Sequence, residues 1–227
     1  MSIPTVENYP PLLSLAVHEV RTPASVVSGY LRMLQRDPEL NERQRKMVDE
    51  AEKSCRRLVE IVAELSDIGK LDSGVAALAR QRIDFFTLTR EVAARVQEGR
   101  DRDVRLAVRG PDAGAPIVGD GPRLRQAVDG VLCAILREHA GPATIVAELR
   151  LEDGAERTAT LVVAEDVNVP AARAARPGAF DEQRGGLGLV LPLARRTIAG
   201  LGGAIWSPAE PDALSRGAIL VRLPLAE

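Results

Sequence analysis

The sequence predicts an α+β chain, in which a helical hairpin is followed by an α/β sandwich. Up to about residue 71, apolar side chains recur at helical spacing with a single polar interruption. From about residue 82 onward, shorter segments alternate between strand and helix patterns. A chain of 227 residues has room for one large or two small domains, and this change of pattern favours two. We place these domains at residues 1–75 and 80–227.

The hairpin is predicted from about Pro11 to Leu71. Its first helix ends near Arg36, and Asp37-Pro38-Glu39-Leu40-Asn41 forms the turn. The second helix carries two series of residues spaced by seven, which form one apolar seam: Met47, Ser54, Ile61 and Ile68, and Ala51, Leu58 and Leu65. Because one hairpin cannot bury its own seams, we expect a homodimer that forms a four-helix bundle with two-fold symmetry. The alternative is a hairpin that covers the second domain as a lid.

The second domain is expected to form a mixed sheet with helices packed on one face. Its predicted strands are residues 104–108, 117–118, 145–151, 158–164, 204–207 and 218–223. Helices are predicted at residues 123–137 and 189–201, with a loop at residues 166–184.

Composition and charge exclude several classes of partner. With a formal net charge of −2, the chain has no bulk attraction to nucleic acid or to an anionic membrane. The first residues lack the pattern of a signal peptide, and no segment is long and apolar enough to span a bilayer. Cys55 and Cys133 lack ligand-type spacing and are expected to be free thiols. We therefore expect a cytoplasmic protein.

Three residues with complementary chemistry, His18, Glu19 and Thr22, lie within one turn of the first helix. Thr22 shares a helix face with His18, and Glu19 is the neighbour that can reach the imidazole ring. The first helix has an apolar series spaced by seven: Leu13, Val20, Val27 and Leu34. His18 is not part of this series, so it should face solvent. Alone, such a histidine is usually a plain surface residue. A carboxylate that fixes its tautomer and a hydroxyl that can orient a water point instead to phosphoryl transfer.

A glycine run, Gly185-Gly186-Leu187-Gly188-Leu189, opens the last predicted helix. Glycines at such a junction let backbone amides approach phosphate oxygens, and the helix N-terminus adds a partial positive charge. In isolation a run of this kind more often marks a tight turn or a cap. Together with the histidine motif it favours a phosphate cradle.

With these pieces in order, the chain resembles the core of a sensor histidine kinase. That core has a HisKA-type dimerisation and phosphotransfer hairpin followed by an ATP-binding domain of the GHKL (Bergerat) type. The segment from His18 to Pro23 is similar to the family's H box, and Leu71-Asp72-Ser73-Gly74 to the end of its second helix. Residues 119–126 resemble the lead-in to its N box, and residues 185–189 its G2 box.

The resemblance implies site residues, cofactors and partners. An active member would use ATP and Mg²⁺, and its partner would be the receiver domain of a response regulator. The catalytic residues implied are His18, Glu19 and Thr22, and the nucleotide-binding residues are Asp166, Gly186, Gly188 and Leu189. No input domain is recognisable, so we expect either a longer receptor or a signal from a separate sensor protein.

The chain departs from the family at the N box, where two asparagines are usual and the second typically ligates magnesium. In register, these positions are Gly130 and Ala134, and neither side chain can ligate a metal. Asp129 and Glu138 lie nearby in sequence as candidate substitutes.

The adenine-binding motif has also lost residues. The family places an aspartate before two alternate glycines, whereas Glu165-Asp166-Val167-Asn168-Val169-Pro170 keeps an acid and loses both glycines. Asp166 is therefore the candidate adenine contact. Ile219 stands where a serine or threonine is usual near the last strand. These losses predict weakened or absent use of ATP.

Three functions remain open. The first is a histidine kinase that phosphorylates His18 from ATP and passes the group to an aspartate of a response regulator. The second is an ATP-independent phosphotransferase or response-regulator phosphatase. The third is a dimeric pseudokinase scaffold, against which the retention of Glu19 and Thr22 counts.

Overall fold

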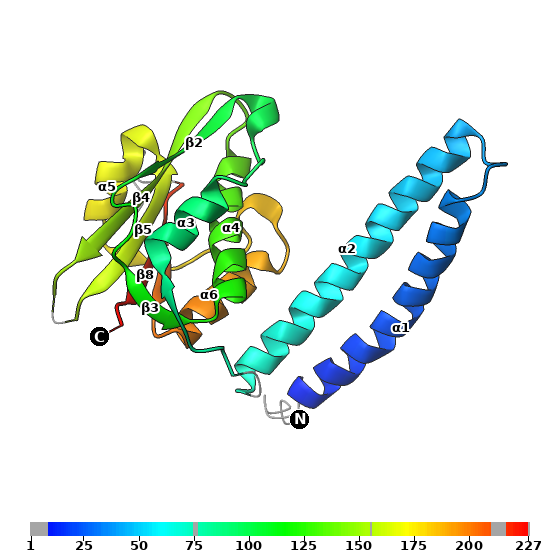
Figure 1. The fold of residues 1–227 in the computed structure, drawn as a ribbon, viewed down its shortest axis with the longest axis horizontal. Coiled ribbons are helices and arrows are strands. Elements are labelled where there is room, and N and C mark those ends of the chain that lie inside the picture. The colour runs from blue at the N-terminus through cyan, green and yellow to red at the C-terminus, as the bar shows by residue number, and fades with distance from the viewer. Residues whose placement is uncertain (1–8, 75–76, 155, 210–216, 227) are drawn as a thin grey trace, which may run out of the picture. The chain divides into compact units, whose positions relative to one another are not determined.

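The computed structural model describes residues 9–74, 77–154, 156–209 and 217–226. It divides into two compact units, Met1–Ala76 and Ala77–Glu227 (Figure 1). The predicted order, a helical hairpin followed by an α/β domain, is confirmed.

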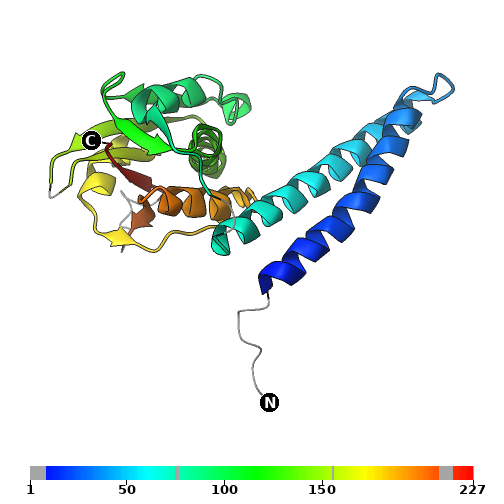
Figure 2. The same cartoon turned by 60° about the horizontal axis from the view of Figure 1, so that its bottom comes forward.

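The hairpin consists of α1 (Tyr9–Gln35) and α2 (Glu42–Asp72), which run in opposite directions (Figures 1 and 2). Asn41 begins the second helix with a capping box. Its side chain accepts a hydrogen bond from the Gln44 N–H at 2.9 Å, and the Gln44 side chain accepts one from the Asn41 N–H at 3.0 Å. Two N–H groups that a helix end would otherwise leave without partners are satisfied in this way. The turn therefore ends where the sequence predicted.

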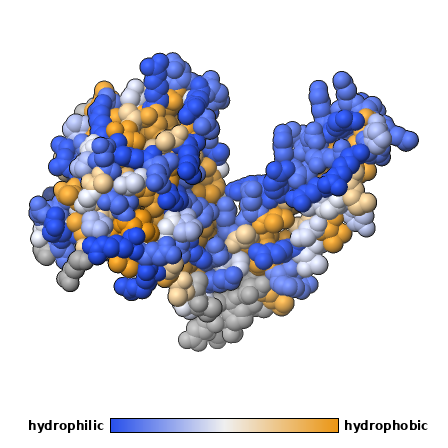
Figure 3. All heavy atoms as spheres, in the orientation of Figure 1, coloured by the Kyte–Doolittle hydropathy of each residue, from blue (hydrophilic) through white to orange (hydrophobic). Residues whose placement is uncertain are grey.

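The hairpin buries a narrow seam and leaves much apolar surface open. Among the side chains that the structure describes from residue 15 onward, the buried apolar residues of the hairpin are Val17, Cys55, Val62 and Ile68. In the same range, nine large apolar side chains are 44% to 69% exposed: Leu15, Val20, Val26, Val27, Tyr30, Met33, Leu34, Met47 and Leu58. Figure 3 shows apolar residues along this part of the chain. An isolated hairpin thus leaves uncovered the kind of surface that a helical bundle buries.

The second unit is built on a six-stranded mixed sheet with the strand order β2-β4-β5-β8-β7-β6. The strands are β2 (Val104–Arg109), β4 (Ala143–Glu152), β5 (Thr158–Glu165), β6 (Pro177–Gly178), β7 (Ala204–Pro208) and β8 (Ile219–Pro224). Strands β2 and β4 are parallel, and the other neighbours are antiparallel. The strand predicted at residues 117–118 is part of β3 (Pro116–Gly119), which pairs instead with β1 (Gln81–Asp84) in a separate sheet.

Helices cover both faces of the large sheet. On one face lie α3 (Phe85–Ala93), α4 (Gly121–Glu138) and α6 (Val190–Gly200), and on the other lies the short α5 (Val169–Ala174) (Figure 1). The side chains of β5 divide accordingly, with Leu161 and Val163 in the larger core and Val162 in the cluster with α5.

The expectation of helices on one face and a plain loop at residues 166–184 was therefore incomplete. The segment from Val169 to Ala174 forms α5. Val169 and Ala172, three residues apart on this helix, pack against apolar residues on the second face of the sheet.

Candidate functional site

His18 is exposed on α1, as the spacing of the apolar residues predicts. Its side chain is 78% exposed, and that of Glu19 is 72% exposed. Nδ1 of His18 lies 3.7 Å from Oε1 of Glu19, which is within ion-pair range but longer than a hydrogen bond. The carboxylate thus lies beside one ring nitrogen and leaves the other, Nε2, for an incoming reactant.

Thr22 lies one turn after His18 and is hydrogen-bonded to the backbone of that residue. Its hydroxyl donates a hydrogen bond to the His18 carbonyl at 3.3 Å. The next residue, Pro23, lies inside α1 and has no N–H for the carbonyl of Glu19 four positions earlier. The three predicted catalytic residues, His18, Glu19 and Thr22, therefore lie together on one turn.

The glycine run of the second unit packs directly onto α4. Gly185, Gly186 and Gly188 have φ angles of +64°, +60° and +66°, which glycine adopts without strain. A Cβ atom on Gly185 would lie 2.8 Å from Cα and 3.0 Å from O of Ala134. The backbone of this loop thus occupies the surface of α4 at the second of the two N-box positions.

The first N-box position is filled in a similar way. Gly130 is buried, and a Cβ atom added there would overlap Cγ1 of Val190 at the start of α6. Ala134 is fully buried. An asparagine at either position would need space that α6 or the glycine loop already occupies.

Arg184, which precedes the glycine run, joins three elements of the sandwich. Its Nε and Nη2 donate to the two carboxylate oxygens of Glu138 on α4, at 2.8 Å and 2.6 Å. Its Nη1 donates to the carbonyl of Ala218, next to β8, at 2.8 Å and to Oγ of Ser207 on β7 at 3.4 Å. The Arg184 side chain is only 10% exposed. Sequence analysis missed this residue, since its partner Glu138 is 46 positions away.

Asp166, the predicted adenine contact, is paired with Arg109 of β2. Its two carboxylate oxygens accept hydrogen bonds from Arg109 at 2.5 Å and 2.8 Å, and these bonds lower the pKa of Asp166. The preceding residue, Glu165, pairs with Ile145 of β4, which belongs to the core under α4. Because paired residues lie on the same face of a sheet, Glu165 points to the α4 side. The orientation of Glu165 was predictable from the sequence, because alternate residues of a strand point to the same face and Glu165 follows Leu161 and Val163 in this alternation.

Asp129, the candidate metal ligand, lies beside Cys133 on α4. The Cys133 thiol contacts Oδ2 of Asp129 at 3.9 Å, and partial burial raises the pKa of this aspartate. Successive helix positions point about 100° apart, so Asp129 does not point toward Val190, which contacts Gly130. In the part of the chain that the structure describes, no cluster of three or more acidic, histidine or cysteine residues could hold a metal ion.

Neither N-box position, Gly130 or Ala134, therefore presents a side chain that could ligate the Mg²⁺ of a bound ATP. The two N-box positions are packed against protein, and Arg184 is bound to Glu138. Of the other predicted contacts, Gly186 has open space around it, and Leu189 precedes α6 without a side-chain capping bond.

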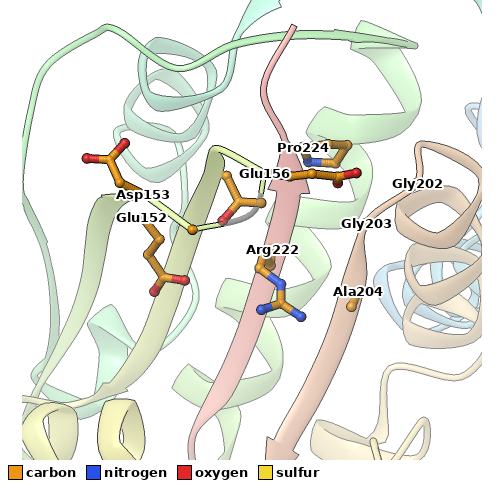
Figure 4. Close-up of a pocket in the computed structure, with 10 residues that line it drawn as sticks. Glu152, Asp153, Glu156, Gly202, Gly203, Ala204, Arg222 and Pro224 are labelled. Atoms are coloured by element: carbon orange, nitrogen blue, oxygen red, sulfur yellow. The ribbon is translucent and has the colours of Figure 1, made fainter.

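A cavity of about 520 Å³ opens elsewhere, where β4 turns into β5. Glu152, Glu156, Thr158 and Arg222 line it together with the backbone of Gly202 and Gly203 (Figure 4). The guanidinium of Arg222 lies 5.3 Å from the ring centre of Trp206. The predicted nucleotide-binding residues do not line this cavity.

An exposed histidine on a helical hairpin, followed by this α/β sandwich, is the architecture of a histidine kinase core. Residues 12–74 match the family model of the His Kinase A (phospho-acceptor) domain. The chain is 28% identical over 224 residues to the sensor protein GacS of Pseudomonas syringae pv. syringae, covering 92% of this chain and 24% of GacS. It is 29% identical over 219 residues to the probable sensor histidine kinase TcrY of Mycobacterium tuberculosis, covering 92% of this chain and 44% of TcrY.

Solved structures show the same fold. The structure of ShkA in complex with AMPPNP superposes with a TM-score of 0.73 at 24% identity, covering 96% of this chain and 46% of ShkA. The histidine kinase AdeS of Acinetobacter baumannii superposes with a TM-score of 0.58 at 17% identity, covering 92% of this chain and 98% of that one.

Residues 12–74 thus match a phospho-acceptor domain, and over about nine tenths of its length the chain is similar to sensor histidine kinases of two-component signalling. It spans less than half the length of either curated relative. Among the described residues, no helix has the length and apolarity that crossing a membrane requires.

Proposed function

We propose that this chain is a homodimeric histidine phosphotransfer protein, in which His18 exchanges a phosphoryl group with an aspartate of a response-regulator receiver domain. The observation that carries the proposal is the exposure of His18 beside Glu19, on a hairpin that matches the phospho-acceptor family. A receiver domain can approach a side chain that is 78% exposed without rearrangement of the hairpin.

The transfer step requires only His18, the aspartyl phosphate of the receiver domain and Glu19. Nε2 of neutral His18 attacks the phosphorus of the aspartyl phosphate, the bond from phosphorus to the acyl oxygen breaks, and the aspartate leaves as a carboxylate. The imidazole then carries a positive charge, which the Glu19 carboxylate near Nδ1 stabilises. The reverse step returns the phosphoryl group to a receiver aspartate.

Thr22 supports a second activity at the same surface. The Thr22 hydroxyl donates a 3.3 Å hydrogen bond to the His18 carbonyl on an exposed helix face. Once this bond is released, the hydroxyl can orient a water molecule toward the aspartyl phosphate. Phosphatase activity would then depend on Thr22, whereas transfer would depend on His18.

The exposed apolar residues of the hairpin support the dimer. Their positions on both helices would form the centre of a four-helix bundle when two copies pair. The signal would reach this dimer either from an input domain of a longer receptor or from a separate sensor protein.

The kinase alternative, in which His18 is phosphorylated from ATP, is supported by the similarity to histidine kinases and opposed by the packed contacts at Gly130 and Ala134. The proposed transfer does not use ATP.

The test is phosphoryl transfer from a panel of receiver domains charged with labelled acetyl phosphate. We expect label on the wild-type chain and none on His18→Gln. Glu19→Gln should slow the transfer by about 10²-fold or more, since positioned acid–base groups contribute on this scale. Thr22→Ala should leave transfer intact and slow the loss of phosphate from the receiver. Label that persists on His18→Gln would contradict the proposal by placing the phosphoryl group on another residue, and no label on the wild type with any receiver would contradict it and favour a scaffold.

A further inference from the structure

The segment from Arg184 to Gly188, here called the closure loop, has the glycines of a phosphate cradle but the contacts of a structural joint. Gly185 lies so close to α4 that even a Cβ atom would be 2.8 Å from Ala134 Cα. In a cradle, the glycine amides approach the ligand and a gap separates loop from helix. Here the loop backbone meets the helix itself.

The start of α6 closes the same space from the other side. Val190 follows the closure loop directly and packs onto Gly130, one turn of α4 before Ala134. The small residues Gly130 and Ala134 allow α4, α6 and the loop to approach this closely. The absence of metal-ligating side chains at Gly130 and Ala134 is therefore what permits this close packing.

Arg184 fixes the loop in this position. It is nearly buried, and its guanidinium makes a two-pronged ion pair with Glu138 as well as a bond to the Ala218 carbonyl. A two-pronged pair of arginine and carboxylate is directional and strong. Opening the loop would leave the Arg184 guanidinium, whose side chain is only 10% exposed, without these partners, which is costly for a charged group so little exposed. The Glu138 carboxylate would also repel a triphosphate.

We infer that the closure loop holds α4 to the sheet and excludes nucleoside triphosphates, so that His18 takes its phosphoryl group from an acyl phosphate, the phosphorylated aspartate of a receiver domain. The identity of the donor rests on the proposed function of His18, whereas exclusion of nucleotide rests on the contacts of the closure loop alone.

The test compares the wild-type chain with Arg184→Ala and, as a matched control, Arg195→Ala. Arg195 lies on α6 and pairs with Glu182 at 2.9 Å, but its side chain is 56% exposed. Hydrogen exchange at residues 184–189 reports whether the loop is held, and titration with a fluorescent ATP analogue and Mg²⁺ reports nucleotide binding. The donor is identified by labelling from γ-labelled ATP and, separately, from a charged receiver domain.

We expect no saturable nucleotide binding by the wild type up to about 1 mM, and label from the receiver but none from ATP. Exchange in the loop should rise at least about tenfold in Arg184→Ala and stay within about twofold of wild type in Arg195→Ala. Saturable nucleotide binding by the wild type, or loop exchange that Arg184→Ala leaves unchanged, would overturn the inference. Absence of both nucleotide binding and receiver transfer would overturn the donor assignment and the proposed function, while the closed loop would stand.

Discussion

Two neighbouring glycines of the closure loop allow its packing to be measured against an internal control. Gly185 and Gly186 have nearly the same φ angle, +64° and +60°. They differ in their surroundings, since a Cβ atom on Gly185 would meet Ala134 at 2.8 Å and 3.0 Å, while one on Gly186 would meet nothing within 4 Å. The variants Gly185→Ala and Gly186→Ala therefore share the conformational cost and differ in the steric one.

The magnitudes follow from these two contributions. An alanine in the left-handed region costs about 1 kcal/mol in either variant. Overpacking against a helix that cannot move away adds about 1–3 kcal/mol at Gly185 alone. We therefore expect the free energy of unfolding to fall by about 1 kcal/mol in Gly186→Ala and by about 2–4 kcal/mol in Gly185→Ala.

Urea unfolding followed by tryptophan fluorescence measures this difference. The signal reports on the second structural unit, which contains the closure loop, because Trp206 is the single tryptophan of the chain and lies on β7. Equal losses of stability in the two variants, within about 0.5 kcal/mol, would mean that the loop does not rest on Ala134, and the account of a closed nucleotide site would fail.

Three further predictions concern a helix cap, a thiol and the dimer. Asp84 caps α3, and although partial burial acts to raise its pKa, hydrogen bonds from the N–H groups of Thr87, Gly114 and Ala115 lower it overall. Its stabilisation is thus present above the unfolded pKa of about 3.9 and lost as pH falls through the lower folded value. Asp84→Asn should cost about 1–3 kcal/mol at pH 7 and markedly less near pH 2 in chemical denaturation, because an amide nitrogen in place of one carboxylate oxygen cannot accept the N–H groups of Gly114 and Ala115. Burial raises the pKa of Cys133 to about 12, so iodoacetamide at pH 8 should modify it at least about 10²-fold more slowly in the native chain than in urea, and equal rates would show the thiol to be open. Val27→Glu should weaken the homodimer at least about tenfold and shift sedimentation toward the 24.4 kDa monomer, whereas an unchanged mass would place the dimer contact elsewhere.

Local signals in the sequence were sufficient for the hairpin and most of the sheet. The apolar series spaced by seven and the capping residue Asn41 act over one or two turns, so they locate α1, α2 and the turn. Strands β4 and β5 have many apolar residues and meet at a short turn, which makes them recognisable. The position of α5 was not recognisable in the same way, because six residues form a helix there only when the sheet offers an apolar second face.

The candidate site divides along the same line. His18, Glu19 and Thr22 form a local motif, and the structure places them on one turn. The losses at Gly130 and Ala134 were visible in the sequence, but what fills their place was not. The ion pair between Arg184 and Glu138 joins positions 46 residues apart, and no periodicity carries that information.

Phosphorus NMR of the chain after incubation with a charged receiver domain, in the absence of nucleotide, tests the central claim most directly. The account predicts a phosphoramidate resonance that is lost in acid and is absent from His18→Gln. An acyl phosphate signal confined to the receiver, or a phosphoramidate that forms only when ATP is added, would contradict it.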